Sequence, residues 1–132
     1  MKTVADTSTF LAVALREPER EWIAGAAAGH DLVAPELLPF EIGNALTALV
    51  QRRAFLPTEL LPAWEMAASI PVELRKVDLR AALSIAAKYK IYAYDAYFLE
   101  CAARLRAPLL TLDRAMNRVA REMSIEILES PR

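Results

Sequence analysis

Short apolar runs alternate along this chain with longer segments that have helical periodicity. Buried strands separated in this way by helices are typical of a mostly parallel sheet that is covered on both faces. The pattern therefore predicts an α/β fold, a three-layer α/β/α sandwich around a short central sheet. The expected strands are residues 3–5, 32–34, 72–77 and 109–112, with an edge strand at 125–128, and the expected helices are 9–15, 18–29, 36–53, 57–69, 79–89, 94–105 and 114–122.

Length and composition indicate one packed domain. The chain has 132 residues, the usual size of one domain, and 55% hydrophobic residues with 3 glycines indicate a globular protein rather than a disordered one. A single cysteine excludes an internal disulfide. The short polar N-terminus is unlike a signal peptide, and no apolar run has transmembrane length. We therefore expect a cytoplasmic protein without a membrane partner.

Charge is unevenly distributed along the chain. The net charge is -1, but residues 1–66 carry 5 Lys and Arg against 9 Asp and Glu, and residues 67–132 carry 11 against 8. Basic residues around an acidic centre would suit a polyanionic substrate, although arginines on surface helices also serve solubility. The arginines that lie nearest the acids of the second half are Arg104, Arg106, Arg114, Arg118 and Arg121.

Four acidic residues lie inside or at the end of apolar segments: Asp6, Glu41, Asp95 and Asp113. A buried carboxylate is unfavourable unless it is paired, hydrogen-bonded or bound to a metal, and these segments contain no matching lysines or arginines. Asp6 and Asp113 follow predicted strands, at the sheet edge where functional groups collect in α/β proteins. If the fold gathers the four, Mg²⁺ or Mn²⁺ would relieve their repulsion.

Each acid also has a structural interpretation. Asp6 and Asp113 precede predicted helices and would be suitable N-caps. Asp95 shares an expected helix face with apolar residues, where a cap is a less complete explanation. Glu41 lies within a helical pattern and could pack its stem while its carboxylate reaches water. Asn44, one turn further on, is placed to hold Glu41 by a hydrogen bond.

Other catalytic chemistries have little support in the sequence. His30 is the single histidine, and no serine has the glycines of a nucleophile elbow. Cys101 lies on an apolar helix face, where core packing is expected. The three glycines do not form a phosphate-binding loop. Aromatic residues available either for base stacking or for core and interface packing are Trp22, Trp64, Tyr92, Tyr94 and Tyr97.

Four blocks of sequence resemble those of PIN-domain ribonucleases, and among these the VapC toxins of toxin–antitoxin pairs. The order and spacing of the blocks carry the resemblance, which spans nearly the whole chain. The blocks are Asp6-Thr7-Ser8, residues 35–46, residues 94–102 and Thr111-Leu112-Asp113. The resemblance implies one PIN-like nuclease domain over residues 1–132.

The resemblance also implies roles for particular residues and partners. Asp6, Glu41, Asp95 and Asp113 would be the catalytic acids that bind Mg²⁺ or Mn²⁺. Supporting roles are implied for Ser8, Asn44 and Thr111. RNA, either tRNA or rRNA, would be the substrate, and a VapB-like antitoxin would block the site. A homodimer is also implied, and we expect its interface on the helices at 64–69 and 89–105.

The sequence thus predicts a metal-dependent endoribonuclease that hydrolyses RNA phosphodiester bonds. Asp6 and Asp95 are the first candidates for metal ligands, followed by Asp113, whereas Glu41 would either bind the ion or orient the nucleophile. One ion and two ions remain alternatives. So do a catalytically silent PIN-like binding module and a DNA nuclease or phosphatase on a related scaffold.

Overall fold

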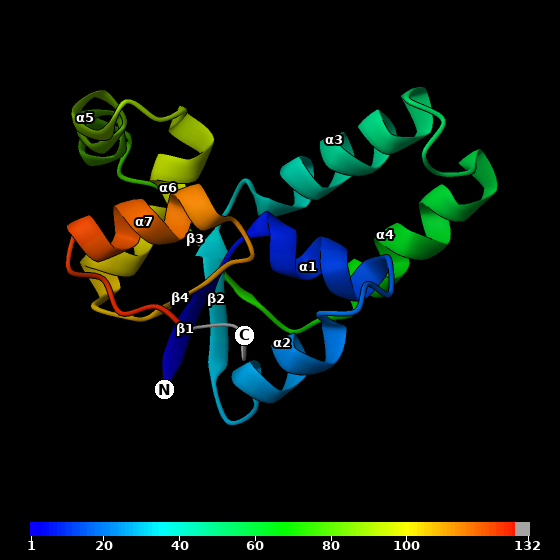
Figure 1. Ribbon diagram of the computed structural model, residues 1–132, viewed down its shortest axis with the longest axis horizontal. Helices are drawn as coiled ribbons and strands as arrows, with labels where there is room; N and C mark the ends of the chain where they lie inside the picture. The colour runs from blue at the N-terminus through cyan, green and yellow to red at the C-terminus, as the bar shows by residue number, and fades with distance from the viewer. Residues whose placement is uncertain (129–132) are drawn as a thin grey trace.

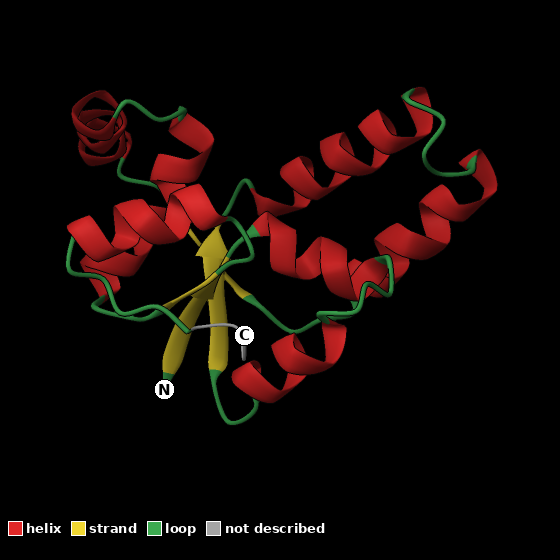
Figure 2. Ribbon diagram, viewed as in Figure 1, coloured by secondary structure: helices red, strands yellow, loops and turns green. Residues whose placement is uncertain are grey.

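The structure, a computed structural model, describes residues 1–128 and consists of a parallel β-sheet with helices on both sides (Figures 1 and 2). The strands are β1 (Lys2–Ala5), β2 (Asp31–Pro35), β3 (Glu73–Arg75) and β4 (Leu109–Leu110). The helices are α1 (Thr7–Ala14), α2 (Arg20–Ala27), α3 (Leu38–Gln51), a short 3-10 helix (Pro57–Glu59), α4 (Leu60–Ala68), α5 (Leu79–Tyr89), α6 (Ala93–Leu105) and α7 (Arg114–Glu122). Among the described residues, no helix is both long enough and apolar enough to span a membrane.

The four strands lie in the order β3-β2-β1-β4, and every pairing is parallel. Helices α1, α2 and α4 lie on one side of the sheet and α5, α6 and α7 on the other (Figure 1). The predicted α/β architecture is therefore confirmed. Since all strands run in the same direction, their carboxyl ends meet at one edge of the sheet, near the starts of α1 and α3 (Figure 1).

The strands are apolar because helices cover both faces of the sheet. Val4 of β1, Val33 of β2 and Leu109 of β4 are fully buried in the core. Cys101 of α6 is also buried there, as expected, and burial raises the pKa of its thiol to about 11. A thiol that stays protonated is a poor nucleophile, so Cys101 serves packing.

Two strands predicted in the C-terminal part of the chain, at 109–112 and 125–128, are longer than those in the structure. Residues 125–128 form no strand but a single bridge, in which Ile127 pairs with Leu109. Strand β4 ends at Leu110 rather than at residue 112. The reason lies in the hydrogen bonds, because the backbone N–H of Leu112 donates to Ser8 Oγ instead of to a neighbouring strand.

Two helices begin later than the sequence predicted. α2 begins at Arg20 because Pro18 lies in a turn, which is closed by the Arg20 N–H donating to the Glu17 carbonyl at 3.0 Å. α3 begins at Leu38 rather than at residue 36. The N–H of Glu36 donates to the Arg75 carbonyl at 2.7 Å, so the sheet pairing continues past β2 and delays the helix.

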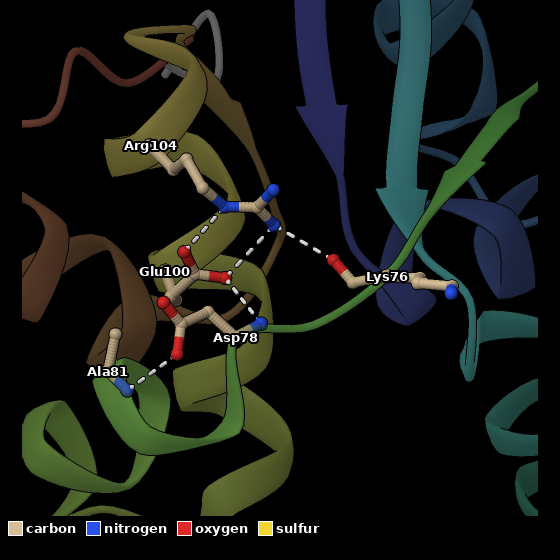
Figure 3. Close-up of polar contacts among 5 residues, drawn as sticks. All are labelled: Lys76, Asp78, Ala81, Glu100 and Arg104. Atoms are coloured by element: carbon tan, nitrogen blue, oxygen red, sulfur yellow. Dashed lines mark hydrogen bonds and ion pairs between the residues drawn. The ribbon is translucent and has the colours of Figure 1, made fainter.

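A polar network ties the connection between β3 and α5 to helix α6, as Figure 3 shows. Arg104 donates to both carboxylate oxygens of Glu100, at 2.7 and 3.2 Å, and to the Lys76 carbonyl at 2.9 Å. Glu100 also accepts a hydrogen bond from the Asp78 N–H, and Asp78 caps α5 by accepting from Ala81. This network fixes α5 against the helix that carries Asp95.

Candidate active site

The fold brings the four sequence-predicted acids to the same end of the sheet. Asp6 follows β1 and Asp113 lies shortly after β4, and these two strands pair side by side. Glu41 lies in the first turn of α3, directly beyond the carboxyl end of β2. Asp95 lies in the first turn of α6, which packs against β1 and β2. Each acid is thus placed where a strand ends or a helix begins.

Asp6 is held by hydrogen bonds from two directions. Its Oδ1 accepts from Ser8 Oγ at 2.6 Å and from the Thr9 N–H at 3.3 Å, which makes Asp6 the N-cap of α1. Its Oδ2 accepts from Thr111 Oγ1 at 2.5 Å. The side chain is 6% exposed, so these bonds fix a nearly buried carboxylate.

The same hydroxyl groups join the β1–α1 junction to the β4–α7 junction. Ser8 Oγ accepts from the Leu112 N–H, and Thr111 Oγ1 accepts from the Asp113 N–H, both at 3.0 Å. Asp113 in turn caps α7, since its Oδ1 accepts from the Met116 N–H at 3.1 Å. Capping is therefore real for both aspartates, but a carboxylate has four lone-pair sites and capping does not use them all.

Glu41 and Asp95 have few polar partners. Glu41 Oε1 is buried and has no hydrogen-bond partner within residues 1–128. Asp95 is half-buried, and no described residue donates a hydrogen bond to its carboxylate. Asn44 is exposed on α3 and forms no hydrogen bond to Glu41 in the described part of the chain, so its supporting role stays a prediction.

Burial makes the charged form of Asp6 unfavourable. It raises the pKa of this carboxyl to about 6, although hydrogen bonds from Ser8, Thr111 and the Thr9 N–H act in the opposite direction. The negative charge of Asp113 adds to the rise. Desolvation thus outweighs three hydrogen bonds at this position.

The charges of neighbouring acids add to the effect of burial on the pKa values of Glu41 and Asp95. Burial, followed by the charges of Asp95 and Asp6, raises the pKa of Glu41 to about 7. The nearby hydroxyl of Thr7 acts in the opposite direction and lowers the pKa of Glu41. Neither Thr7 Oγ1 nor Glu41 Oε1 has a full hydrogen bond within residues 1–128. Burial and the charge of Asp113 raise the pKa of Asp95. Each acid therefore repels two others, and none of the salt bridges formed within residues 1–128 neutralises them.

The residues of this acidic ring (Asp6, Glu41, Asp95 and Asp113) fit a hard divalent cation. All donors are carboxylate oxygens, and the orphaned Glu41 Oε1 is a buried acceptor that lacks the partner such atoms normally have. Within residues 1–128, no three His, Cys, Asp or Glu side chains already converge on one point as metal ligands. Since hydrogen bonds hold Asp6 in place, rotation of the less firmly held Glu41 and Asp95 side chains would be needed to bring three carboxylates onto one ion.

Two polar residues beside the acidic ring were missed in the sequence. Thr7 follows Asp6, and its Oγ1 is buried without a partner. Asn117 lies one turn after Asp113, donates from Nδ2 to the Thr111 carbonyl at 3.5 Å and leaves its Oδ1 buried without a partner. Their proximity in sequence to two of the acids was the signal that could have identified them.

The predicted basic surround is present in part. Arg114 and Arg118 are exposed on α7, the helix that Asp113 caps. Arg104 has a structural role instead, because it pairs with Glu100 and the Lys76 carbonyl. Positive charge is therefore available on α7 beside the acids, but not from every arginine that the sequence placed there.

Known proteins resemble this chain in sequence and in fold. The model of the PIN domain family matches residues 3–122. Ribonuclease VapC3 of Pyrobaculum aerophilum is 28% identical over 121 residues, which cover 88% of this chain and 92% of that protein. The crystal structure of PAE2754 from Pyrobaculum aerophilum superposes with a TM-score of 0.67 at 22% identity, covering 90% of this chain and 84% of the other. VapBC2 from Rickettsia felis, crystallised with a fragment of promoter DNA, gives a TM-score of 0.66 at 10% identity and covers 97% of this chain and 98% of its own. The structures support the fold, and the match over residues 3–122 shows that this chain belongs to the PIN domain family.

Proposed function

We propose that this protein is a metal-dependent endoribonuclease, the toxin of a VapBC-type toxin–antitoxin pair. The observation that carries the proposal is the acidic ring, in which burial and the charges of neighbouring acids raise the pKa values of Asp6, Glu41 and Asp95, and Glu41 Oε1 is buried without a partner within residues 1–128. Such a ring is unfavourable in itself and gains stability when a divalent cation is bound. Packing of the fold alone does not explain why four acids lie at the same end of the sheet.

The comparisons support the same function. The chain belongs to the PIN domain family, and its similarity to the ribonuclease VapC3 extends over most of both proteins. The assignment of RNA as substrate follows that relative's name, and tRNA or rRNA is the class we expect. The exposed Arg114 and Arg118 on α7 are suited to contact its phosphates.

In the proposed mechanism, Asp6, Asp95 and Asp113 would hold Mg²⁺ or Mn²⁺. When bound, the cation supplies Lewis-acid activation of water and neutralises charge that develops on the phosphodiester. Ser8 and Thr111 keep the Asp6 carboxylate in one orientation through their 2.6 and 2.5 Å hydrogen bonds. Preorganised ligands of this kind lose little entropy when the ion binds.

Glu41 has the environment of a group that moves a proton. Its pKa of about 7 lies near neutral pH, where a carboxyl can both accept and release a proton. The partnerless Oε1 is the atom we assign to orient the attacking water or to complete the coordination. After hydrolysis the proton leaves to solvent, because Glu41 is only half-buried.

The proposal includes two protein partners. A VapB-like antitoxin would cover the site, and one apolar surface that could receive it is a cavity of about 170 Å³ between α1, α3, α4 and β3. The cavity is lined in part by Phe10, Leu38, Ile42 and Trp64. A homodimer is the second expectation. The middle of α6, from Phe98 to Ala102, is buried within the protomer, which leaves the exposed residues within 64–69 and the two ends of α6 for such an interface.

Cleavage of total RNA by the purified protein tests the proposed function. With Mg²⁺ or Mn²⁺ present, we expect new RNA ends at defined positions, and we expect none with EDTA or with Asp95→Asn. Asp31→Asn is the matched control, since Asp31 is an exposed aspartate that begins β2 at the opposite end of the strands. Full cleavage by Asp95→Asn with Mg²⁺ supplied would refute the assignment.

The same preparation separates the alternative functions. Cleavage of DNA or of small phosphoesters, with RNA left intact, would indicate a DNA nuclease or phosphatase. Binding of Mn²⁺ without cleavage of any of these substrates would favour a silent PIN-like binding module.

A further inference from the structure

Exposed aromatic rings lie next to the two candidate acids that helices carry. Phe40 directly precedes Glu41 on α3 and is 81% exposed. Tyr92, the N-cap residue of α6, is 86% exposed, and Tyr94, which directly precedes Asp95, is 58% exposed. Exposed aromatic side chains that gather around one site, unlike apolar side chains that are scattered singly, indicate a binding surface.

These rings belong to one site although they come from distant segments. Phe40 precedes Glu41 in the first turn of α3, which begins just beyond the carboxyl end of β2. Tyr94 precedes Asp95 in the first turn of α6, which packs against β1 and β2. Both helices begin at the end of the sheet where β1 and β2 finish (Figure 1). Phe40, Tyr92 and Tyr94 therefore lie at the end of the sheet that carries the acidic ring.

The connection between α5 and α6 adds positive charge beside the tyrosines. Lys88 and Lys90 are both exposed, and Lys90 ends α5 in a left-handed conformation with φ of 56°. Lys90 is the C-cap residue of α5 and Tyr92 is the N-cap of α6, so the connection between the two helices is short. Cations alternating with exposed rings are the usual surface for a single nucleic-acid strand, in which phosphates pair with the cations and bases stack on the rings.

The two tyrosines differ in how firmly they are held. Tyr94 contacts Tyr97 edge to face, with ring centroids 5.9 Å apart and an interplanar angle of 87°. Tyr92 has no ring contact of this kind within residues 1–128. Tyr92 is therefore the ring with more freedom to adjust to the position of a base.

We propose that Phe40, Tyr92 and Tyr94 stack on unpaired bases on either side of the phosphodiester that is bound at the acidic ring. The inference rests on the proposed function and deepens it, because it names the side chains that would contact the bases beside the bond to be cleaved. Bases in an RNA duplex are already stacked and present no free face to a side chain. A second copy of this chain is the competing occupant of these rings, and the experiment below separates the two.

Binding to RNA without metal tests this proposal independently of cleavage. The probes are a labelled, unstructured RNA of roughly 12 nucleotides and a hairpin duplex of the same length, and binding is measured by fluorescence anisotropy in EDTA. Phe40→Leu and Tyr92→Leu keep apolar volume but remove the ring face, whereas Tyr92→Phe keeps it. Leu61→Ala is the control, since Leu61 is 65% exposed on α4 and has no ring to lose.

We expect each leucine variant to bind the unstructured RNA about 5- to 100-fold more weakly. Tyr92→Phe and Leu61→Ala should bind like the unchanged protein, and the duplex should bind weakly throughout. Equal binding of single strand and duplex, or leucine variants that bind like Leu61→Ala, would overturn the proposal.

Light scattering on the same variants tests the competing occupant. If the leucine substitutions turn a dimer into monomers but leave RNA affinity equal to that of Leu61→Ala, the rings contact a second copy of the chain. In that case the proposal is wrong. The RNA-cleavage assay is separate. If the leucine variants bind RNA more weakly but no protein, changed or unchanged, cleaves it, this inference stands and the proposed nuclease function is wrong. If the leucine variants bind RNA normally and the unchanged protein cleaves it, the nuclease function stands and this inference is wrong.

Discussion

Replacing Asp6 with asparagine should stabilise the metal-free protein at neutral pH, because the substitution removes a buried charge. Asp6 is 6% exposed, and burial raises its pKa from 3.8 to about 6. Asparagine has the same shape, and its Oδ1 can still accept from Ser8 and the Thr9 N–H. The hydroxyl of Thr111 would accept from the new amide instead of donating to a carboxylate.

The magnitude and its pH dependence follow from the pKa shift. A rise from 3.8 to about 6 is about 2 units, and one unit corresponds to about 1.4 kcal/mol, so the upper limit is about 3 kcal/mol. Because folding raises this pKa, the native state binds the extra proton between these two values. The stabilisation from that proton is complete below pH 3.8 and is lost as the pH rises through about 6. The advantage of Asp6→Asn should therefore be smallest in acid and reach at most about 2 kcal/mol at pH 7, after about 1 kcal/mol is allowed for weaker hydrogen bonds.

Urea unfolding in EDTA, measured from acid to neutral pH for both proteins, provides the assay. Asp78→Asn is the control, because Asp78 also caps a helix, through the Ala81 N–H at 3.1 Å, but is not part of the acidic ring. We expect it to change the free energy of unfolding by less than about 1 kcal/mol. A difference between Asp6→Asn and the unchanged protein that stays flat with pH, or that becomes more destabilising toward pH 7, would contradict the reasoning.

Three further outcomes follow from the same structure. Glu41→Gln should stabilise the metal-free protein in a higher pH range than Asp6→Asn, with its midpoint near pH 7, and by a smaller amount because Glu41 is partly exposed; the same urea series measures it. Mn²⁺ should raise the melting temperature above pH 7 and do so less at pH 5, since protons compete for the carboxylates, and EDTA should reverse the shift in a thermal scan. Arg104→Ala should lower the free energy of unfolding by about 1–3 kcal/mol, because it leaves the nearly buried Glu100 without its partner, and should increase hydrogen exchange between β3 and α5.

The sequence predicted the interior of the fold better than its margins. β1 and β2 were predicted to within a residue or two because both are apolar runs that end at Asp6 or Pro35. The run at 125–128 has the same character, yet it forms a single bridge at Ile127. Whether an apolar segment becomes a strand depends on a free neighbouring edge, and that edge is supplied by residues distant in sequence.

The acids of the candidate site were identifiable because a carboxylate in an apolar segment is a local anomaly. Which way a helix turns its side chains was harder to predict. The run at 37–42 is apolar apart from Glu41, but packing buries Leu38 and Ile42 and leaves Phe40 in solvent. Asn44 was predicted beside Glu41 and is exposed instead. These orientations depend on the rotation of α3 against its neighbours, which a single sequence does not specify.

Calorimetric titration of the metal-free protein with Mn²⁺ at neutral pH measures whether the acidic ring is an ion-binding site. We predict saturable binding by the unchanged protein and by the control Asp31→Asn, and strongly weakened binding by Asp95→Asn. Protons should be released on binding, since Asp6 and Glu41 have raised pKa values. An unchanged protein that binds no Mn²⁺, or an Asp95→Asn variant that binds it equally well, would contradict the role assigned to these four acids.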